Sequence, residues 1–325
     1  MRVETATSSP PAGVLIVDKP RGLTSHDVVT HVRRIAGVRR VGHAGTLDPD
    51  ATGVLVVCVG RATKISRFLM EQPKEYVATI HLGVETDSLD ADGTIVRRGD
   101  PSGVTEEKLC EVLERFQGEV VQIPPMVSAL KREGKRLYEL ARMGLTVERP
   151  ARRITVFSVR LLEFSPPTFR IALRCSKGTY VRVLASDVGA ALGCGAHLSG
   201  LRRLAVGRFR AEESSTLEDL AAAAEADRLP ELLISLSDAL SELPAVLVRE
   251  DHVRRVANGA AVTPESVAHY PEALRPDDRV RIMGAGGELL GVGKATVPGT
   301  EAAKTYAGLV MVRPERMLVG ASLPR

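Results

Sequence analysis

The stretch VGHAGTLDPDATG, residues 41–53, is a polar segment that contains three glycines and is expected to form a loop. It lies between two apolar runs, residues 13–17 and 54–59, of the kind that forms buried strands. Pro49 fixes its own φ and favours an extended conformation at Asp48, so we expect this carboxylate on a stiff turn. A rigid loop that carries a carboxylate at the edge of a sheet is suited to chemistry.

Three interpretations of this loop are open. Asp-Pro and Asp-Ala-Thr-Gly segments form purely structural turns, because Asp side chains hydrogen-bond to nearby backbone. Asp48, Asp50 and Thr52 also spell D-x-D-x-T, the pattern of aspartate-nucleophile phosphatases. Those enzymes need a strand directly before the motif, and AGTL is a poor strand; no convincing carboxylate pair for magnesium follows downstream. The third interpretation is a family resemblance, which depends on motifs elsewhere in the chain.

Length and composition limit the class of protein. The 325 residues suit one large or two ordinary domains, and with 44% hydrophobic residues and no Trp the core is aliphatic. No apolar run approaches the roughly 20 residues that span a bilayer, and residues 1–13 lack the apolar block of a secretory signal. Four cysteines are widely spaced without a C-x-x-C pair, which argues against a zinc site and a disulfide framework. We therefore expect a cytoplasmic protein.

Positive charge is clustered, although the net charge is only +4. Any one cluster, taken alone, is explained by a solvated face. Together the clusters fit a partner with a phosphate backbone. They comprise Arg33, Arg34, Arg39 and Arg40; Lys131, Arg132, Lys135 and Arg136; Arg152 and Arg153; and Arg202 and Arg203.

Strands and helices alternate without a regular βαβ rhythm, which predicts an α+β fold with a mostly antiparallel sheet. The expected strands cover residues 13–17, 54–59, 75–82, 151–164 and 168–175. The expected helices cover residues 25–36, 62–70, 105–116, 137–143 and 181–192, with a largely helical connector at 217–240 that Pro230 interrupts. From about residue 242 the chain has short β-rich segments with glycine-rich turns.

Eight motifs, in this order, resemble the TruB family, the tRNA pseudouridine-55 synthases. The match covers roughly the first two thirds of the chain and is specific because the motifs are many and ordered. They are GVLIVDKPRGLTSHDVV (13–29), GHAGTLDPDATGVL (42–55), GRATK (60–64), KEYVATIHLG (74–83), TDSLDADG (86–93), QIPPMVSALKREGKRLYELAR (122–142), CSKGTYVR (175–182) and GCGAHLSGLRRLAVG (193–207).

The resemblance implies a pseudouridine synthase fold, a mixed and mostly antiparallel sheet flanked by helices, in residues 1–240, with a thumb-like segment at about 122–153. It implies a small β-rich PUA-like RNA-binding domain in residues 241–325. The implied activity is isomerisation of uridine 55 in the T loop of tRNA, by base flipping and an aspartate nucleophile. No cofactor or metal is expected, and the implied partner is the T arm, bound by a monomer.

The same resemblance assigns catalytic roles to four residues. Asp48 is the implied nucleophile, in a pocket that excludes water, beside Arg182, which Asp90 braces. Tyr76 is implied to stack on the target base and to help with the proton on C5. Ordinary explanations also exist: Arg182 as a helix-start arginine and Tyr76 as a strand core residue. A calcium loop at LDADG is excluded, because the EF-hand spacing fails.

Further residues are implied to bind the substrate. Tyr180 and Leu201 match positions that line the uracil pocket, and His43 matches a histidine that enters the RNA helix when the base leaves it. Lys19, Arg61 and Lys64 are candidates for phosphate contacts. Leu201 taken alone suits a core position, and His43 suits a solvated loop.

Two rival functions need fewer of these residues. RNA binding with folding assistance requires the basic segment and the PUA-like domain but not Asp48, and the family may combine both roles. A guide-dependent ribosomal RNA relative of the same family is disfavoured, because the chain has no long lysine-rich tail and its thumb-like segment is of the bacterial kind.

Overall fold

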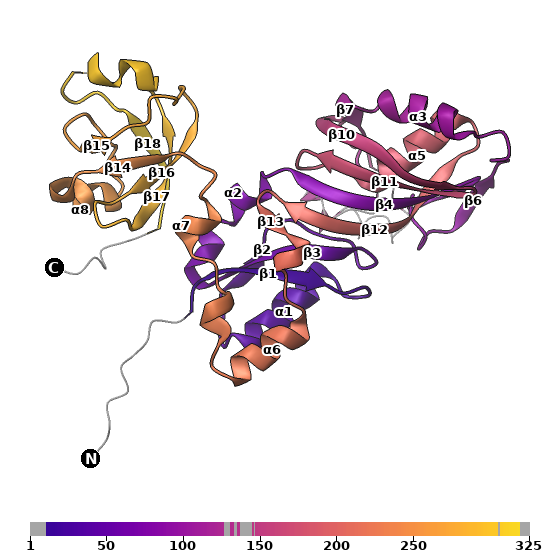
Figure 1. The fold of residues 1–325 in the computed structure, drawn as a ribbon, viewed down its shortest axis with the longest axis horizontal. Helices are drawn as coiled ribbons and strands as arrows, with labels where there is room; N and C mark the ends of the chain where they lie inside the picture. Colours follow the sequence, from indigo (N-terminus) through magenta and orange to yellow (C-terminus); the bar gives the residue numbers. More distant parts are fainter. Residues whose placement is uncertain are drawn as a thin grey trace.

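The computed structural model describes residues 11–126, 131–132, 135–136, 145, 147–304 and 306–318. Two larger β-sheets with flanking helices make up most of this part of the chain, which confirms the α+β fold class (Figure 1). The nine-stranded sheet contains β1 (Gly13–Lys19), β2 (Val41–His43), β3 (Thr52–Val59), β4 (Lys74–Leu82), β7 (Gly118–Gln122), β10 (Arg152–Ser165), β11 (Thr168–Cys175), β12 (Ala196–Val206) and β13 (Phe209–Arg210). Two small hairpins are formed by β5 (Val84–Thr86) with β6 (Ile95–Arg98) and by β8 (Lys131–Arg132) with β9 (Lys135–Arg136).

The large sheet has the strand order β1-β3-β12-β4-β11-β10-β7. Its described pairings are antiparallel except that of β12 with β3, where Arg202 pairs with Thr52 and Arg203 with Gly53. Gly53 has a φ of 98°, and a Cβ there would lie 2.2 Å from the carbonyl oxygen of Arg203. Only glycine therefore allows β3 and β12 to meet at this point, which is where the loop of residues 44–51 ends.

Helices cover the sheet where its apolar residues face them. On one face of β1 and β3 lie α1 (Ser25–Ile35) and α6 (Leu217–Glu225), and α3 (Glu106–Glu114) and α5 (Val181–Leu192) pack on the half formed by β4, β11 and β10 (Figure 1). Thr24 caps α1 in a capping box with Asp27. The Thr24 cap fixes where the helix that supports the 44–51 loop begins.

Some predicted helices are shorter than expected. Residues 60–70 form a 3-10 helix, η1 (Gly60–Lys64), and a short α2 (Ser66–Met70) rather than one helix. The 217–240 connector is divided into α6, η3 (Leu229–Leu232) and α7 (Leu236–Ala239), because Asp227 adopts a φ of 56° and Pro230 restarts the chain in η3. The helix predicted at residues 137–143 lies outside the described residues.

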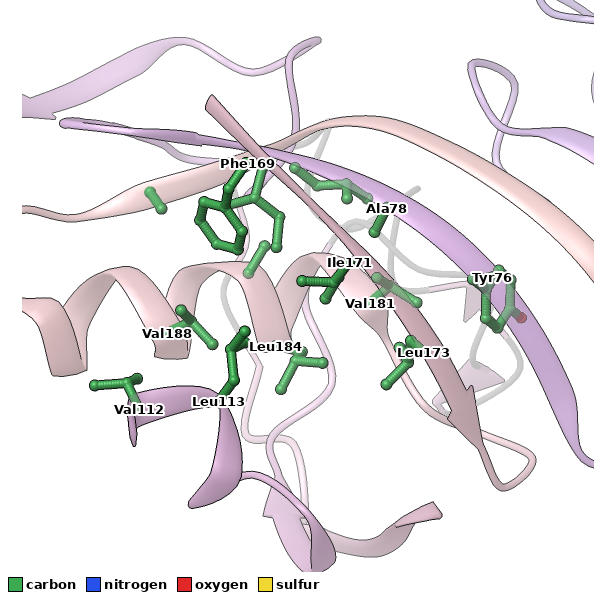
Figure 2. Close-up of a cluster of buried hydrophobic side chains, with 14 of the residues drawn as sticks. Tyr76, Ala78, Val112, Leu113, Phe169, Ile171, Leu173, Val181, Leu184 and Val188 are labelled. Carbon is green, nitrogen blue, oxygen red and sulfur yellow. The ribbon is translucent and has the colours of Figure 1, made fainter. Parts of the chain in front are cut away.

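The core beside α5 follows from the alternation of β4 and β11. Tyr76 and Ala78 of β4 and Phe169, Ile171 and Leu173 of β11 share one face of the sheet and are buried. Figure 2 shows them packed on Leu184 and Val188 of α5 and on Val112 and Leu113 of α3, with Tyr76 at one end of the row. Each large apolar side chain buried here contributes about 1.5–3 kcal/mol. The core thus fixes α5, and with it Arg182, against β4.

The second sheet has the order β15-β14-β16-β17-β18 and its own core. Its elements are β14 (Ala245–Val248), η4 (Glu250–His252), α8 (Val253–Ala257), β15 (Val267–His269), β16 (Arg279–Met283), β17 (Leu289–Ala295), η5 (Gly299–Lys304) and β18 (Val312–Met317), and η2 (Ala211–Glu213) lies before it in the chain. The β-rich character predicted from residue 242 is confirmed, and the domain boundary at 240/241 stays a prediction. No helix in the described ranges is long and apolar enough to cross a membrane.

The two sheets contact each other beside α2. Val292 and Leu318 join an apolar cluster with residues of β1, β3 and α2. Around it, Arg279 of β16 pairs with Glu71 and with Glu315 (2.8 Å), and Arg67 donates to the carbonyl of Glu315 at 3.1 Å. The second sheet therefore sits next to the segment that leads from α2 into β4.

Candidate active site

The loop of residues 44–51 is held by hydrogen bonds at several points. The amide of Ala44 donates to Val56 at 2.8 Å, and that of Ala51 donates to Asp48 at 3.1 Å, which closes the turn. Buried Ser25 of α1 accepts from the amide of Leu47 at 2.9 Å and donates to its carbonyl at 3.0 Å. The Asp48 turn is therefore tied to both a strand and a helix.

Asp48, Arg182 and Asp90 form a linked group at this loop. Arg182, near the start of α5, lies 3.5 Å from Asp48 and 2.9 Å from Asp90. The Arg182 side chain is only 5% exposed, whereas that of Asp48 is 52% exposed. The structure thus brings the expected partners together, but the carboxylate of Asp48 lies at an open cavity rather than in the dry pocket expected from the sequence. The Asp48 side chain is exposed to solvent because its loop borders the cavity, whereas the Arg182 side chain is buried in the core.

Asp90 is fixed on its own loop between β5 and β6. Its Oδ1 accepts from the hydroxyl of Ser88 at 2.5 Å and from the amide of Asp92 at 3.3 Å. Its carbonyl accepts from Thr86 at 2.7 Å. Asp90 can therefore orient the guanidinium of Arg182 without moving itself.

A cavity of about 860 Å³ opens beside Asp48. Five of the predicted site residues line it: Asp48, Tyr76, Tyr180, Arg182 and Leu201. Its wall also carries positive charge, from Arg67, Lys74, Arg152, Lys177 and Arg203. Two carboxylates, Asp48 and Glu71, lie among several cations with aromatic and apolar surface, which suits a flat uncharged ring attached to an anionic backbone.

Tyr76 is buried at the end of the core row, with its phenol oxygen directed away from the packed side chains (Figure 2). Burial raises the pKa of this phenol, and the charge and hydrogen bond of Arg203 oppose the rise. Tyr76 is therefore neutral at physiological pH and carries a proton at the cavity wall.

Tyr180 precedes the first residue of α5 and is positioned by Gln122. The buried Gln122 side chain, at the end of β7, accepts from the amide of Tyr180 at 3.1 Å and donates to its carbonyl at 3.3 Å. This places Tyr180 in the wall of the same cavity as Asp48, and its contact with the base stays a prediction.

Lys19 does not fit the expected phosphate contact. It is fully buried, and its ammonium donates to the carbonyls of Pro20 (2.9 Å), Leu23 (2.6 Å) and Pro49 (2.8 Å). Burial lowers the pKa of Lys19 to about 8, a shift that the nearby Asp48 and Asp50 partly oppose. Lys19 is therefore not placed to bind phosphate, because its ammonium already holds the turn that contains Pro49 and would have to give up these bonds to reach a phosphate.

His43, Arg61 and Lys64 are not among the described residues that line the cavity. His43 is in β2, its Nδ1 is buried without a hydrogen-bond partner among the described residues, and burial lowers its pKa. Lys64 is in η1 and donates to the carbonyl of Leu318 at 3.3 Å, at the contact between the sheets. Arg61 lies in the same 3-10 helix and is exposed. The RNA contacts expected of these three residues stay predictions.

Sequence reasoning missed three residues that shape the site. Arg203 was assigned only to a basic cluster and Lys74 only to a motif, but both are buried, and Lys74 donates to the carbonyls of Met70 and Gln72. Gln122 was noticed only within a motif. Nothing in the local pattern marks the Gln122 amide as buried or distinguishes Arg203 from Arg202.

Other chemistry is less well supported by the geometry. No group of His, Cys, Asp or Glu side chains suited to a metal ion occurs in the part of the chain that the structure describes. The D-x-D-x-T motif does not follow a strand directly, since β2 ends at His43. All four cysteines are free, and burial raises the pKa of Cys58 to about 12.

Comparison with known proteins shows the family of this chain. Residues 33–181 match the N-terminal domain of the TruB family pseudouridylate synthases, residues 182–241 match the C-terminal domain of tRNA pseudouridylate synthase B, and residues 244–318 match the PUA domain. The chain is 47% identical over 277 residues to tRNA pseudouridine synthase B of Syntrophotalea carbinolica, which covers 85% of this chain and 90% of that protein. The chain belongs to the TruB family.

A second TruB relative, tRNA pseudouridine synthase B of Pelotomaculum thermopropionicum, is 46% identical over 87% of this chain and 91% of its own. Among solved structures, a Cbf5-Nop10-Gar1 complex has a TM-score of 0.77 at 31% identity, covering 95% of this chain and 85% of that one. An H/ACA RNP bound to a substrate RNA containing 2'-deoxyuridine has a TM-score of 0.75 at 28% identity, covering 98% and 93%. The resemblance to the TruB family and the pseudouridine synthase fold with a PUA domain are thus confirmed.

Proposed function

We propose that this TruB-family enzyme isomerises uridine 55 in the T loop of tRNA to pseudouridine, in the cytoplasm and as a monomer. The observation that carries the proposal is the single cavity in which Asp48, Arg182, Tyr76, Tyr180 and Leu201 meet. Relatives named tRNA pseudouridine synthase B, at 44–47% identity, support tRNA as the substrate.

The reaction exchanges one glycosidic bond for another. The N1–C1′ bond breaks and its electron pair leaves with the uracil, the base rotates, and C5 bonds to C1′. The proton on C5 is then lost and N1 gains one, so neither a redox partner nor water is consumed. A carboxylate is suited to hold an anomeric carbon while the base turns.

Asp48 is the nucleophile in this proposal, because it is the carboxylate that lines the cavity closest to Arg182. The guanidinium of Arg182, held by Asp90, orients Asp48 and offsets its negative charge. Arg182 thus keeps the attacking oxygen directed at the substrate while the uracil leaves.

Tyr76, Tyr180 and Leu201 are proposed to hold the base. The phenol of Tyr76 can donate a hydrogen bond to uracil or help move the C5 proton, and Tyr180 and Leu201 supply flat and apolar surface. Their positions require the nucleotide to leave its stack, which costs a few kcal/mol. Contacts of Arg67, Arg152 and Lys177 with phosphates offset that cost.

The direct test maps pseudouridine in unmodified tRNA after incubation with wild type and Asp48→Asn. Asp50→Asn is the matched control, since Asp50 lies two residues away and pairs with exposed Arg21 at 3.1 Å. We expect Asp48→Asn to lose at least about 10³-fold in rate, as nucleophile substitutions do, and Asp50→Asn to stay within about threefold. Activity retained by Asp48→Asn, or modification at another position, would contradict the proposal.

RNA folding assistance is a second candidate, favoured by the PUA domain match at residues 244–318. It does not require Asp48. If wild type and Asp48→Asn accelerate refolding of misfolded tRNA equally, the chain has this second role.

A further inference from the structure

We propose that Arg203 is a positioning residue that holds the Asp48 loop and Tyr76 in their reactive arrangement. The inference rests on the proposed function, because it assigns Arg203 a part in that reaction. Arg203 does not need to touch the substrate for this role; it acts through the loop and the phenol.

The side chain of Arg203 joins the two ends of the loop. It is 1% exposed, although the adjacent charged residues Arg202 and Arg203 suggest a surface position. Its Nε donates to the carbonyl of Val54 at 2.7 Å, on the far side of the loop. Its Nη2 and Nη1 donate to Gly45 at 3.0 Å and to Thr46 at 3.4 Å, on the near side. One rigid guanidinium therefore sets the distance between the points where the loop leaves and re-enters the sheet.

Two glycines of the loop lie against Arg203, Gly53 at its main chain and Gly45 at its guanidinium. Arg203 pairs in register with Gly53, where a Cβ would lie 2.2 Å from the Arg203 carbonyl. Gly45 has a φ of 112°, and a Cβ there would lie 3.8 Å from Nη1 of Arg203. Both ends of the loop thus approach Arg203 as glycine backbone, so the three carbonyl contacts depend on one arrangement of the chain.

The charge of Arg203 is not neutralised by an acid. Within the described ranges no carboxylate lies at ion-pairing distance from it, and carbonyl dipoles surround it instead. Arg203 also lines the cavity beside Tyr76. Arg203 pairs in register with Tyr76 across β12 and β4, and its charge opposes the rise in the pKa of the Tyr76 phenol.

The experiment compares Arg203→Lys and Arg203→Met with a matched control, Arg281→Met. Arg281 is partly buried and also donates to carbonyls, of Leu243 (3.0 Å) and Ser237 (3.4 Å), but it lies in β16 and does not line the cavity. Single-turnover pseudouridine formation and KM for tRNA are measured with each variant, together with thermal unfolding.

We expect Arg203→Met to reduce the single-turnover rate about 10²-fold, the loss typical of a misplaced reactive group, with KM within about twofold. Arg203→Lys, which keeps the charge but can satisfy fewer carbonyls, should recover part of that rate. Arg281→Met should lower the unfolding temperature and keep the rate. The proposal is overturned if both Arg203 variants keep the wild-type rate, if the loss is in KM alone, or if Arg281→Met loses the same rate.

Hydrogen exchange of backbone amides tests the positioning role of Arg203 without measuring catalysis. Peptides that cover residues 44–54 should exchange faster in Arg203→Lys than in wild type and in Arg281→Met. Unchanged exchange there would contradict the positioning role, even if Arg203→Met does not fold. If instead wild type and Arg281→Met both fail to form pseudouridine while the exchange changes as expected, the proposed function fails and the loop assignment stands.

Discussion

Arginine side chains stabilise both the Asp48 loop and the contact between the two sheets, but through different interactions in the two regions. At the loop, Lys19 and Arg203 are buried and donate to main-chain carbonyls, and Arg182 is buried between two carboxylates. At the contact, Arg279 and Lys177 pair with Glu71 at the surface, around an apolar cluster. Bonds to buried carbonyls fix a geometry, whereas exposed ion pairs contribute little and weaken with salt.

The largest effect is expected where the buried network reaches the reacting group. Arg182→Met removes the cation between Asp48 and Asp90, which leaves two neighbouring carboxylates without their shared partner. We expect a loss of about 10²- to 10³-fold in the single-turnover rate, with tRNA binding within about threefold. A rate near wild type would show that Asp48 does not depend on Arg182. The measurement is pseudouridine formation with enzyme in excess, alongside a filter-binding titration.

Lys19→Met tests the buried network through stability. Removing the ammonium leaves the carbonyls of Pro20, Leu23 and Pro49 without this donor, at about 1–3 kcal/mol for a buried unsatisfied group. We expect the free energy of unfolding in urea to fall by about 2–4 kcal/mol. If Lys19 were instead a phosphate ligand, the variant would keep its stability and show a reduced salt dependence of tRNA binding.

His43 gives the buried region a pH dependence. Burial lowers the folded-state pKa of His43, so below its ordinary value of 6.5 the unfolded chain binds the proton more readily than the folded one. The contribution of His43 is complete above pH 6.5 and is lost as the pH falls from there. Wild type should therefore lose more stability than His43→Gln between pH 7 and pH 5. Parallel stability curves for the two proteins would refute this assignment.

Glu71→Gln tests the exposed ion pairs at the contact between the two sheets. It removes the carboxylate that pairs with Arg279 and Lys177. We expect at most about 1 kcal/mol of lost stability, most of it absent in 0.5 M salt. A loss as large as that of Lys19→Met would mean that the exposed pairs hold the sheets together as firmly as buried bonds hold the loop. Urea unfolding at low and high salt measures this.

Much of the fold could be predicted because it depends on local pattern. The alternation of residues 75–82 gives β4 one buried face, the apolar run 54–59 gives a buried strand, and the Thr24 cap fixes α1. These features need only neighbouring residues. The family motifs also bring Asp48, Asp90 and Arg182 to one place, as the resemblance implies.

The parts that could not be predicted depend on register between distant segments. Arg202 and Arg203 read as one basic pair, yet the strand places them differently: Arg202 forms a two-pronged pair with Asp18 at 3.0 and 2.9 Å, and Arg203 is buried. The burial of Lys19 depends on a carbonyl 30 positions away, at Pro49. Long-range contacts of this kind leave no periodic signal in the sequence.

We propose that the carboxylate of Asp48, positioned by buried Arg182 and Arg203, attacks the uridine as its N1–C1′ glycosidic bond breaks in tRNA. Since the C5 hydrogen leaves only when C5 has bonded to C1′, tritium release from tRNA labelled at uridine C5 reports the complete reaction. We predict release of one label per tRNA by wild type and by Asp50→Asn, and none above background by Asp48→Asn over the same time. Release by Asp48→Asn at the wild-type rate would contradict the account.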